Sequence, residues 1–246
     1  MEVRVFLSPH LDDAVLSCGG LIARQVATND VVTVLTVCAG EPGRLPLSDL
    51  AQSMHARWGI DRATSADRRT EDRMACGRLG ASVIHYDLPD AIYRRSPAGE
   101  VLYPTEEALI GPIHPAEADR VAQLAAWLAE GCPPEAEVYC PLGLGGHVDH
   151  RLTRAAAEQT GRPLWYYRDF PYAARGGQLP NGWTLPGKET IVSLSPEEVQ
   201  TWGDAITEYR SQLSTFWEDP YAQFEELRAF HDGNGGLSLR APARAP

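Results

Sequence analysis

The chain has 246 residues, of which 43% are hydrophobic and 22% are charged, a composition typical of a globular protein with a sizeable core. Its length suits one α/β domain with modest elaborations. The formal net charge of −11 argues against a surface that binds nucleic acid or an anionic membrane. A small anionic substrate is still compatible, because a local pocket can oppose the global sign.

We expect no signal peptide, because the apolar stretch in "MEVRVFLSPH" stops at residue 7 with no basic region before it. No run approaches the roughly 18 apolar residues of a membrane span. The five cysteines are odd in number and scattered, and no CxxC pair is present. This usage favours free thiols in a reducing compartment, so a cytoplasmic protein is expected. The sequence is silent on the oligomeric state.

The first part of the chain predicts a βαβ unit. Residues 2–8 form an apolar, β-branched run typical of a strand, and residues 13–28 have the apolar spacing of a helix buried on one side. Residues 30–38 are continuously apolar, as in parallel strands buried on both faces. Gly19 and Gly20 weaken the helix and are expected to allow close packing on the sheet.

The rest of the chain continues this alternation of strands and helices. A long loop-rich stretch over 39–66 indicates a functional loop, and 91–115 is again irregular. We predict helices over 66–80, 116–130, 151–161 and 196–215. Further strands are predicted in "ASVIHYDLPD", where a turn follows, at the start of "EAEVYCPLGLGGHVDH" and of "RPLWYYRDFPYA", where loops follow, and in "KETIVSLS". The sequence thus predicts one doubly wound, Rossmann-like α/β domain over 1–232, with a mostly parallel sheet and helices on both faces, and a flexible tail over 233–246.

The motif "PHLDD" places His10, Asp12 and Asp13 directly after the first predicted strand. Sites in such folds lie beyond the carboxyl ends of the strands. Either aspartate alone could be a helix N-cap, where the helix dipole stabilises a carboxylate by about 0.3–1 kcal/mol. One aspartate suffices for a cap, however, and a second adds repulsion unless a cation is present.

The motif "GGHVDH" places His147 and His150 after the fourth predicted strand. Side chains three residues apart on a helix share a face, so both imidazoles can point into one cavity. A lone histidine at such a junction is more often structural, but a pair behind a glycine-rich turn is less easily dismissed. The glycines suggest a phosphate cradle, but neither GxxxxGK[ST] nor GxGxxG is present, which counts against a Rossmann-like nucleotide binder.

Both polar clusters fall at the same edge of the predicted sheet. Imidazole and carboxylate ligands suit zinc with one open position for water, and two histidines with one carboxylate also suit ferrous iron. Zinc lowers the pKa of bound water from 15.7 to about 7. Hydrolysis at such a site also needs a base and a donor facing the developing oxyanion, and the spare aspartate and the spare histidine fit these roles.

The two motifs together resemble those of the PIG-L (LmbE-like) family. Four other stretches are similar to the family pattern in order and spacing, namely "RRTEDRMACGRLG", "DLPD", "YYRDFPYA" and "AITEYRSQL". The resemblance covers most of residues 3–216. It implies a metal-dependent N-deacetylase that acts on N-acetylglucosamine conjugates or related metabolites.

The resemblance also implies roles for individual residues. His10, Asp13 and His150 would hold the metal. Asp12 would be the general base that activates the attacking water and later protonates the leaving amine. His147 would stabilise the tetrahedral oxyanion, as a cation or as a hydrogen-bond donor.

Arg68 and Asp90 match family positions that line the substrate pocket. Each could equally be structural, and Arg68 could pair with Glu71 along its helix. The sequence departs from the family pattern at three positions, which are Leu11 in place of proline, Ala14 in place of glutamate, and Gly145 in place of a mobile tyrosine. Another group must therefore support a metal ligand, and no tyrosine gate is expected at residue 145.

We therefore expect a zinc-dependent enzyme, with Fe²⁺ as the alternative metal, that deacetylates a small N-acetylated amino sugar. One alternative is a metal-dependent amidase acting on a non-sugar acyl amide. Another is a non-catalytic metal- or ligand-binding homologue, which the presence of Asp12 and His147 argues against. The loops over 39–66 and 88–115 are expected to set specificity. Candidate pocket aromatics are Tyr93, Tyr103, Tyr166, Tyr167 and Tyr172.

Overall fold

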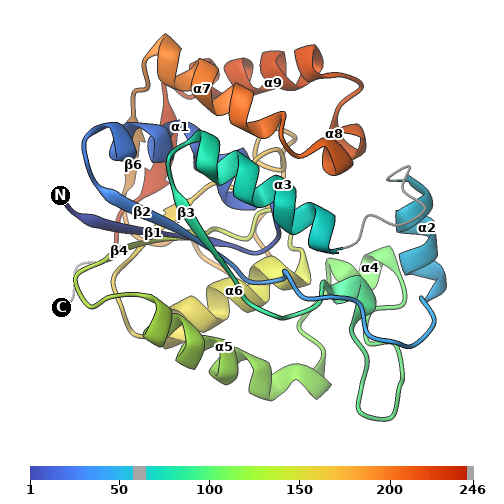
Figure 1. Cartoon of the computed structure of the whole chain (residues 1–246). Coiled ribbons are helices and arrows are strands. Elements are labelled where there is room, and N and C mark those ends of the chain that lie inside the picture. The colour runs from blue at the N-terminus through green and yellow to red at the C-terminus, as the bar shows by residue number, and fades with distance from the viewer. Residues whose placement is uncertain (58–64, 243–246) are drawn as a thin grey trace.

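A seven-stranded, mostly parallel sheet forms the centre of the protein in the computed structural model, which describes residues 1–57 and 65–242 (Figure 1). Its strand order is β3-β2-β1-β4-β5-β7-β6, and β7 runs antiparallel to both of its neighbours. This confirms the expected fold class. The strands are β1 Val3–Ser8, β2 Val31–Thr36, β3 Ser82–His85, β4 Glu137–Pro141, β5 Leu164–Tyr167, β6 Glu189–Val192 and β7 Leu237–Arg240.

Helices cover both faces of the sheet. Figure 1 shows α1 (Asp13–Ala27) and α3 (Ser65–Arg78) on one face, and α5 (Ala118–Gly131) and α6 (Val148–Gln159) on the other. Two later helices, α7 (Pro196–Ile206) and α9 (Pro220–Gly233), lie outside α1 and form a further layer. The shorter elements are α2 (Asp49–Arg57), η1 (Ala91–Tyr93), α4 (Glu106–Leu109), η2 (Pro115–Glu117) and α8 (Arg210–Phe216).

The strands divide their side chains between two apolar clusters. Phe6 of β1 faces the cluster under α1, α3 and α7, whereas its neighbours Val5 and Leu7 face the cluster over α5 and α6. This alternation follows from the two-residue period of a strand, and it explains why the strand sequences are continuously apolar. A third cluster includes Leu50 of α2, Ile92 of η1 and Val148 of α6. It packs the irregular segments against the start of α6, at the carboxyl end of the strands.

The glycine pair in α1 faces a helix and not the sheet, which differs from the sequence expectation. A Cβ atom on Gly19 would lie 2.4 Å from Trp202 Cδ1 of α7, and one on Gly20 would lie 2.6 Å from Leu194 Cδ1. Trp202 Nε1–H donates a 2.7 Å hydrogen bond to the carbonyl of Val15. The two glycines therefore let α7 approach the backbone of α1.

The end of the chain also differs from the expected flexible tail. Residues 237–240 form β7 between β5 and β6, and its side chains Leu237 and Leu239 are buried. They complete the apolar cluster under α7 and α9. Residues 243–246 of the expected tail lie outside the described residues. The domain thus continues through β7.

Two further differences concern helices. The expected loop over 39–66 contains α2, although residues 58–64 of that stretch lie outside the described residues. The helix expected over 196–215 is divided into α7 and α8, and Tyr209 directly precedes α8. The hydroxyl of Tyr209 donates a 2.7 Å hydrogen bond to Asp72 Oδ1 of α3, so α8 begins beside α3.

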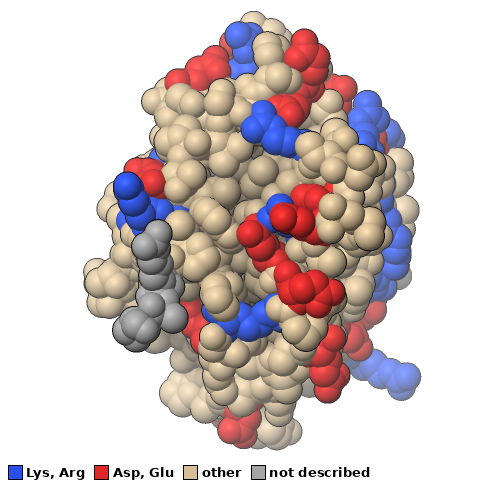
Figure 2. Space-filling view, turned by 90° about the vertical axis from the view of Figure 1, so that its left-hand side faces the viewer, with Lys and Arg blue, Asp and Glu red and all other residues tan. Residues whose placement is uncertain are grey.

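Charged side chains at the amino-terminal side of the sheet lie next to groups of opposite sign. Figure 2 shows acidic and basic side chains intermingled on this face. At the start of β1, Arg4 pairs with Glu2 and Glu137, and its Nε lies 3.0 Å from Asp30 Oδ2. Within the residues that the structure describes, no helix combines the length and the apolar character needed to cross a membrane.

Candidate metal centre

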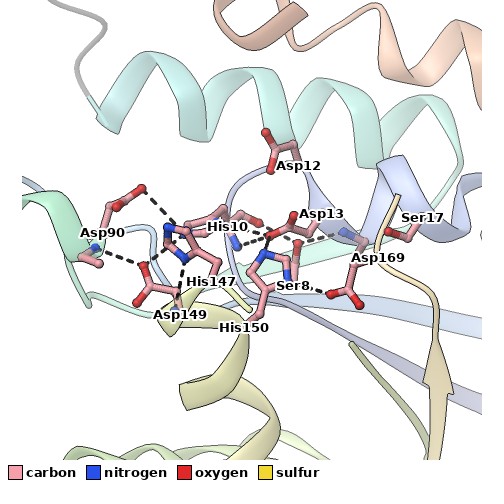
Figure 3. Close-up of polar contacts among 12 residues, drawn as sticks. Ser8, His10, Asp12, Asp13, Ser17, Asp90, His147, Asp149, His150 and Asp169 are labelled. Carbon is pink, nitrogen blue, oxygen red and sulfur yellow. Dashed lines mark hydrogen bonds and ion pairs between the residues drawn. The ribbon is translucent and has the colours of Figure 1, made fainter. Parts of the chain in front are cut away.

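The polar motifs meet where the sheet changes its direction of winding. Strands β1 and β4 are neighbours, and the helices that follow them, α1 and α6, lie on opposite faces. Such a switch point opens a crevice beyond the carboxyl ends of the two strands. His10, Asp12 and Asp13 follow β1, and His147 and His150 follow β4, so all five predicted residues are brought together here (Figure 3).

Three of these side chains form a compact donor set. One ligand atom each from His10, Asp13 and His150 lies within 4.8 Å of the others. Asp13 Oδ2 is 3.1 Å from His10 Nδ1 and 3.3 Å from His150 Nε2. His150 is fully buried, and its Nε2 makes no hydrogen bond within the described part of the chain. An orphaned imidazole nitrogen facing a carboxylate fits a divalent ion, and this donor set suits Zn²⁺ or Fe²⁺.

The opposite charges in this donor set strongly shift one another's pKa values. Burial alone would raise the pKa of Asp13, but His150 and then His10 outweigh it and hold that pKa well below its usual range. Burial alone would lower the pKa of His150, but Asp13 and Asp169 raise it to about 10. Without an ion the imidazole thus holds a proton, and a cation that binds here takes the place of that positive charge.

Asp12 stands at the N-cap position of α1 but makes no capping hydrogen bond. Figure 3 shows its carboxylate directed towards α3, away from that of Asp13. It pairs with Arg68 of α3, whose Nη2 lies 3.8 Å from Asp12 Oδ2. Burial, and then the charge of Asp13, raise the pKa of Asp12 to about 7. A carboxyl group with this pKa can take up and release a proton near neutral pH.

His147 caps the amino end of α6 with its ring. Its Nδ1 accepts a 3.2 Å hydrogen bond from the backbone N–H of Asp149. Burial, and then the charge of His10, lower the pKa of His147 to about 4. The neutral ring therefore carries its proton on Nε2, where it is a hydrogen-bond donor. The ring centroid lies 4.9 Å from that of His10, at the side of the donor set.

A carboxylate that the sequence reasoning missed supports His150. Asp169 follows β5, and its Oδ1 lies 2.7 Å from His150 Nδ1. Its Oδ2 accepts a 2.9 Å hydrogen bond from the backbone N–H of Leu144. Such a partner fixes the ring and directs Nε2 towards the ion. Its position after a parallel strand, inside the quoted "YYRDFPYA", was the available signal.

A second missed carboxylate supports His10. Asp149 Oδ2 lies 3.1 Å from His10 Nε2 and accepts a 3.0 Å hydrogen bond from the backbone N–H of Ala91. The guanidinium of Arg94 pairs with the other carboxylate oxygen. Burial would raise the pKa of Asp149, but Arg94 and His10 hold it well below its usual range. The ionised Asp149 therefore fixes the orientation of the His10 ring.

The predicted substrate residues occupy different positions around this centre. Arg68 faces Asp12 and not Glu71, whose carboxylate accepts a 2.6 Å hydrogen bond from Ser211 Oγ. Asp90 Oδ2 lies 3.7 Å from His10 Nε2. The same side chain accepts a hydrogen bond from the backbone N–H of Ile92, so it also caps η1.

The candidate aromatic residues fall into two groups. Tyr103, Tyr166 and Tyr167 are buried in the apolar clusters. Tyr172 and Tyr93 lie near the centre. The Tyr172 ring is 5.9 Å from that of His150, and a Cβ atom on residue 145 would lie 3.0 Å from Tyr172 Cδ1. The space beside Gly145 is therefore filled by a tyrosine from another segment.

The two irregular segments line a cavity, and one lining residue, Arg94, pairs with Asp149 of the centre. Residues 42–48, together with residues between Pro89 and Val101, line about 320 Å³ of space. Tyr93 belongs to this lining, and its hydroxyl lies 2.7 Å from His55 Nε2 of α2. A cavity of this size can hold part of a small ligand.

Comparison with known proteins gives one family model and several similar deacetylases. The family model "PIG-L: GlcNAc-PI de-N-acetylase" matches residues 5–160, more than half of the chain. A 2′-N-acetylparomamine deacetylase of Niallia circulans is 29% identical over 226 residues, 85% of this chain and 80% of that protein. A 1D-myo-inositol 2-acetamido-2-deoxy-alpha-D-glucopyranoside deacetylase of Saccharomonospora viridis is 30% identical over 233 residues, 92% and 82% of the two chains.

A solved structure extends this likeness over nearly the whole chain. The zinc-inhibited form of teicoplanin deacetylase Orf2 superposes with a TM-score of 0.81 at 30% identity, covering 99% of this chain and 100% of that one. Each of these three relatives is named as a deacetylase, which confirms the expected class of amide hydrolases. The chain therefore belongs to the PIG-L family, as its paired aspartate and histidine motifs predicted.

Proposed function

We propose that this enzyme is a zinc-dependent N-deacetylase of a small N-acetylated amino-sugar conjugate, with Fe²⁺ as the alternative metal. The observation that carries the proposal is the convergence of His10, Asp13 and the orphaned His150 Nε2, with Asp12 and His147 beside them. His10, Asp13 and His150 would hold the ion. When bound, it would polarise the amide carbonyl and lower the pKa of water.

The residues around the ion would manage the protons and the developing charge. Asp12 takes the proton of the attacking water and delivers it to the leaving amine, and a pKa of about 7 suits both steps. His147 donates its Nε2–H to the oxyanion of the tetrahedral intermediate. One preorganised donor of this kind typically contributes about 3 kcal/mol. The amide carbon–nitrogen bond breaks, and acetate and a free amine leave.

The substrate class is supported by the relatives and by the surroundings of the centre. The named relatives act on an acetylated paromamine, an inositol-linked acetamido sugar and teicoplanin. Arg68 and Asp90 carry the charges that would contact sugar hydroxyls, and the cavity between residues 42–48 and 89–101 would take the rest of the conjugate. A cytoplasmic location belongs to the same proposal and is supported by five free, buried cysteines.

Release of amine from a substrate panel tests this proposal. Metal-free protein, and protein with one equivalent of Zn²⁺ or Fe²⁺, are assayed on N-acetylated aminoglycosides, inositol-linked acetamido sugars and N-acyl amino acids. We expect metal-dependent turnover of the sugars. Equal turnover after thorough chelation would contradict the metal mechanism, and a preference for N-acyl amino acids would favour the non-sugar amidase.

The general base has a test of its own. In Asp12→Asn, kcat should fall about 10²–10⁴-fold while the bound metal, measured by elemental analysis, is unchanged. The matched control is Asp119→Asn, an exposed aspartate in the first turn of α5, which should keep full activity. Unchanged turnover in metal-loaded Asp12→Asn would remove Asp12 from its role.

A further inference from the structure

His10 is shared by two groups of potential metal ligands, one at each ring nitrogen. Its Nδ1 faces Asp13 in the donor set described above, and its Nε2 faces Asp149. Cys38 lies on this second side, and one ligand atom each from His10, Cys38 and Asp149 lies within 4.8 Å of the others. The proposed reaction uses neither Cys38 nor this side of the ring.

The fold holds the second group in place. Cys38 follows β2, and its backbone N–H donates a 2.8 Å hydrogen bond to the carbonyl of Pro9, which keeps the cysteine beside the end of β1. Asp149 is fully buried and Cys38 nearly so. Asp90 Oδ2 lies 3.7 Å from the same ring nitrogen, His10 Nε2. Imidazole, thiolate and carboxylate together are ligands for zinc and other thiophilic divalent ions.

We propose that His10 Nε2, Cys38 Sγ and the Asp149 carboxylate form a second metal site, and that its occupation inhibits the enzyme. Binding requires the loss of the Nε2 proton of His10 and the Sγ proton of Cys38, both of which leave to solvent. Asp149 is already ionised. The His10 ring then bridges the two ions through its two nitrogens.

The second site should be weaker than the first. The Cys38 thiol must lose its proton before it can bind an ion. The guanidinium of Arg94, paired with Asp149, also opposes a second cation. The first equivalent of metal therefore fills the set with His150, and only further metal reaches Cys38.

Inhibition follows from what the second ion displaces. It replaces the 3.1 Å contact between His10 Nε2 and Asp149 Oδ2, which orients a ligand of the first ion. It also places a positive charge on the side of the His10 ring that faces Asp90, which we propose as a substrate contact. Loss of a supporting partner of a metal ligand typically costs about 10–100-fold in activity or metal affinity, so a loss of this size is expected.

The experiment is a stepwise titration with Co²⁺, which reports thiolate ligation directly. Protein with one equivalent is taken to two and more, while near-ultraviolet absorption and amine release are followed. We expect a thiolate-to-metal charge-transfer band with the second equivalent but not the first, together with the loss of activity. Cys38→Ser should show no band and should stay active at two equivalents. Cys132→Ser, a buried cysteine at the end of α5, is the control and should behave as the unmodified chain does.

Two outcomes would overturn the proposal. One is the absence of a thiolate band in the unmodified protein at any metal concentration that inhibits it, a result that needs no folded variant. The other is inhibition of Cys38→Ser at the same metal concentration as the unmodified protein. The inhibition arm rests on the proposed deacetylase function, whereas the spectroscopic arm does not, so failure of the two can be told apart.

Discussion

Asp169 is expected to hold His150 in the geometry that binds the ion. Asp169→Asn keeps the shape of the side chain but removes the charge that faces His150 Nδ1 at 2.7 Å. Metal affinity should fall about 10–100-fold, measured by competition with a chromophoric chelator. Asp204→Asn, a half-buried aspartate of α7 that pairs with Arg78, should bind metal as the unmodified protein does. Equal affinities for both variants would show that Asp169 does not support the ligand.

The site residues that the sequence identified belong to local motifs. His10, Asp12 and Asp13 lie within four positions, and residue type together with the end of a strand was enough to single them out. The supporting carboxylates could not be found in this way, because their partners are distant along the chain. Asp149 contacts His10 across 139 positions, and only the pairing of β1 with β4 makes that contact possible.

Burial of Asp12 should make the metal-free protein less stable as the pH rises. Its pKa is about 7 in the folded chain against an ordinary value of 3.8, so folding favours the protonated form. The contribution of Asp12 to the free energy of unfolding is fully present below about pH 4 and is lost as the pH rises through about 7. The shift corresponds to about 4 kcal/mol.

The test compares the metal-free protein with Asp12→Asn, whose amide stays neutral at every pH. Urea unfolding in the presence of a chelator should give similar stabilities near pH 4. At pH 8 the variant should be the more stable of the two. Stability curves that run parallel from pH 4 to pH 8 would show that burial of Asp12 is not costly.

At the scale of elements, Gly19 in α1 and Gly77 in α3 allow the effect of packing on stability to be distinguished from that of helix propensity. Gly19→Ala would place a Cβ atom 2.4 Å from the Trp202 ring, and overpacking of this kind typically costs about 1–3 kcal/mol. Gly77→Ala in α3 would meet nothing within 4 Å, and alanine favours a helix over glycine by about 0.5–1 kcal/mol. Gly19→Ala should therefore lower, and Gly77→Ala raise, the free energy of unfolding measured in urea. Changes of the same sign would contradict the contact between α1 and α7.

The elements that the sequence predicted well have strong periodic patterns. Strands β1, β2 and β4 and helices α1, α3 and α5 agree with their predicted ranges to within a few residues. The pattern failed for β7, because "GLSLRAPARAP" contains only four residues of alternating apolar character within a glycine-, arginine- and proline-rich stretch. Its place between β5 and β6 depends on pairing, which no local signal encodes.

At the scale of the whole molecule, the sheet brings together ligands from two halves of the chain. His10 and Asp13 belong to the β1–α1 unit, and His150 belongs to the β4–α6 unit, so a bound ion links units that are more than a hundred positions apart. Because such a site exists only in the folded chain, metal binding adds to the free energy of unfolding. At a free metal concentration about 100 times Kd, the gain is about 2.7 kcal/mol.

This link predicts which variants respond to metal. The unmodified protein and Asp12→Asn should both gain stability when Zn²⁺ is added to the metal-free form, because Asp12 is not a ligand in the proposed centre. His150→Ala should gain much less, since it lacks one of the three donors. The measurement is urea unfolding with and without metal, followed by both far-ultraviolet circular dichroism and tryptophan fluorescence. The two probes should shift together, because the ion joins both halves of the sheet. An equal gain in His150→Ala would mean that the stabilising ion binds elsewhere.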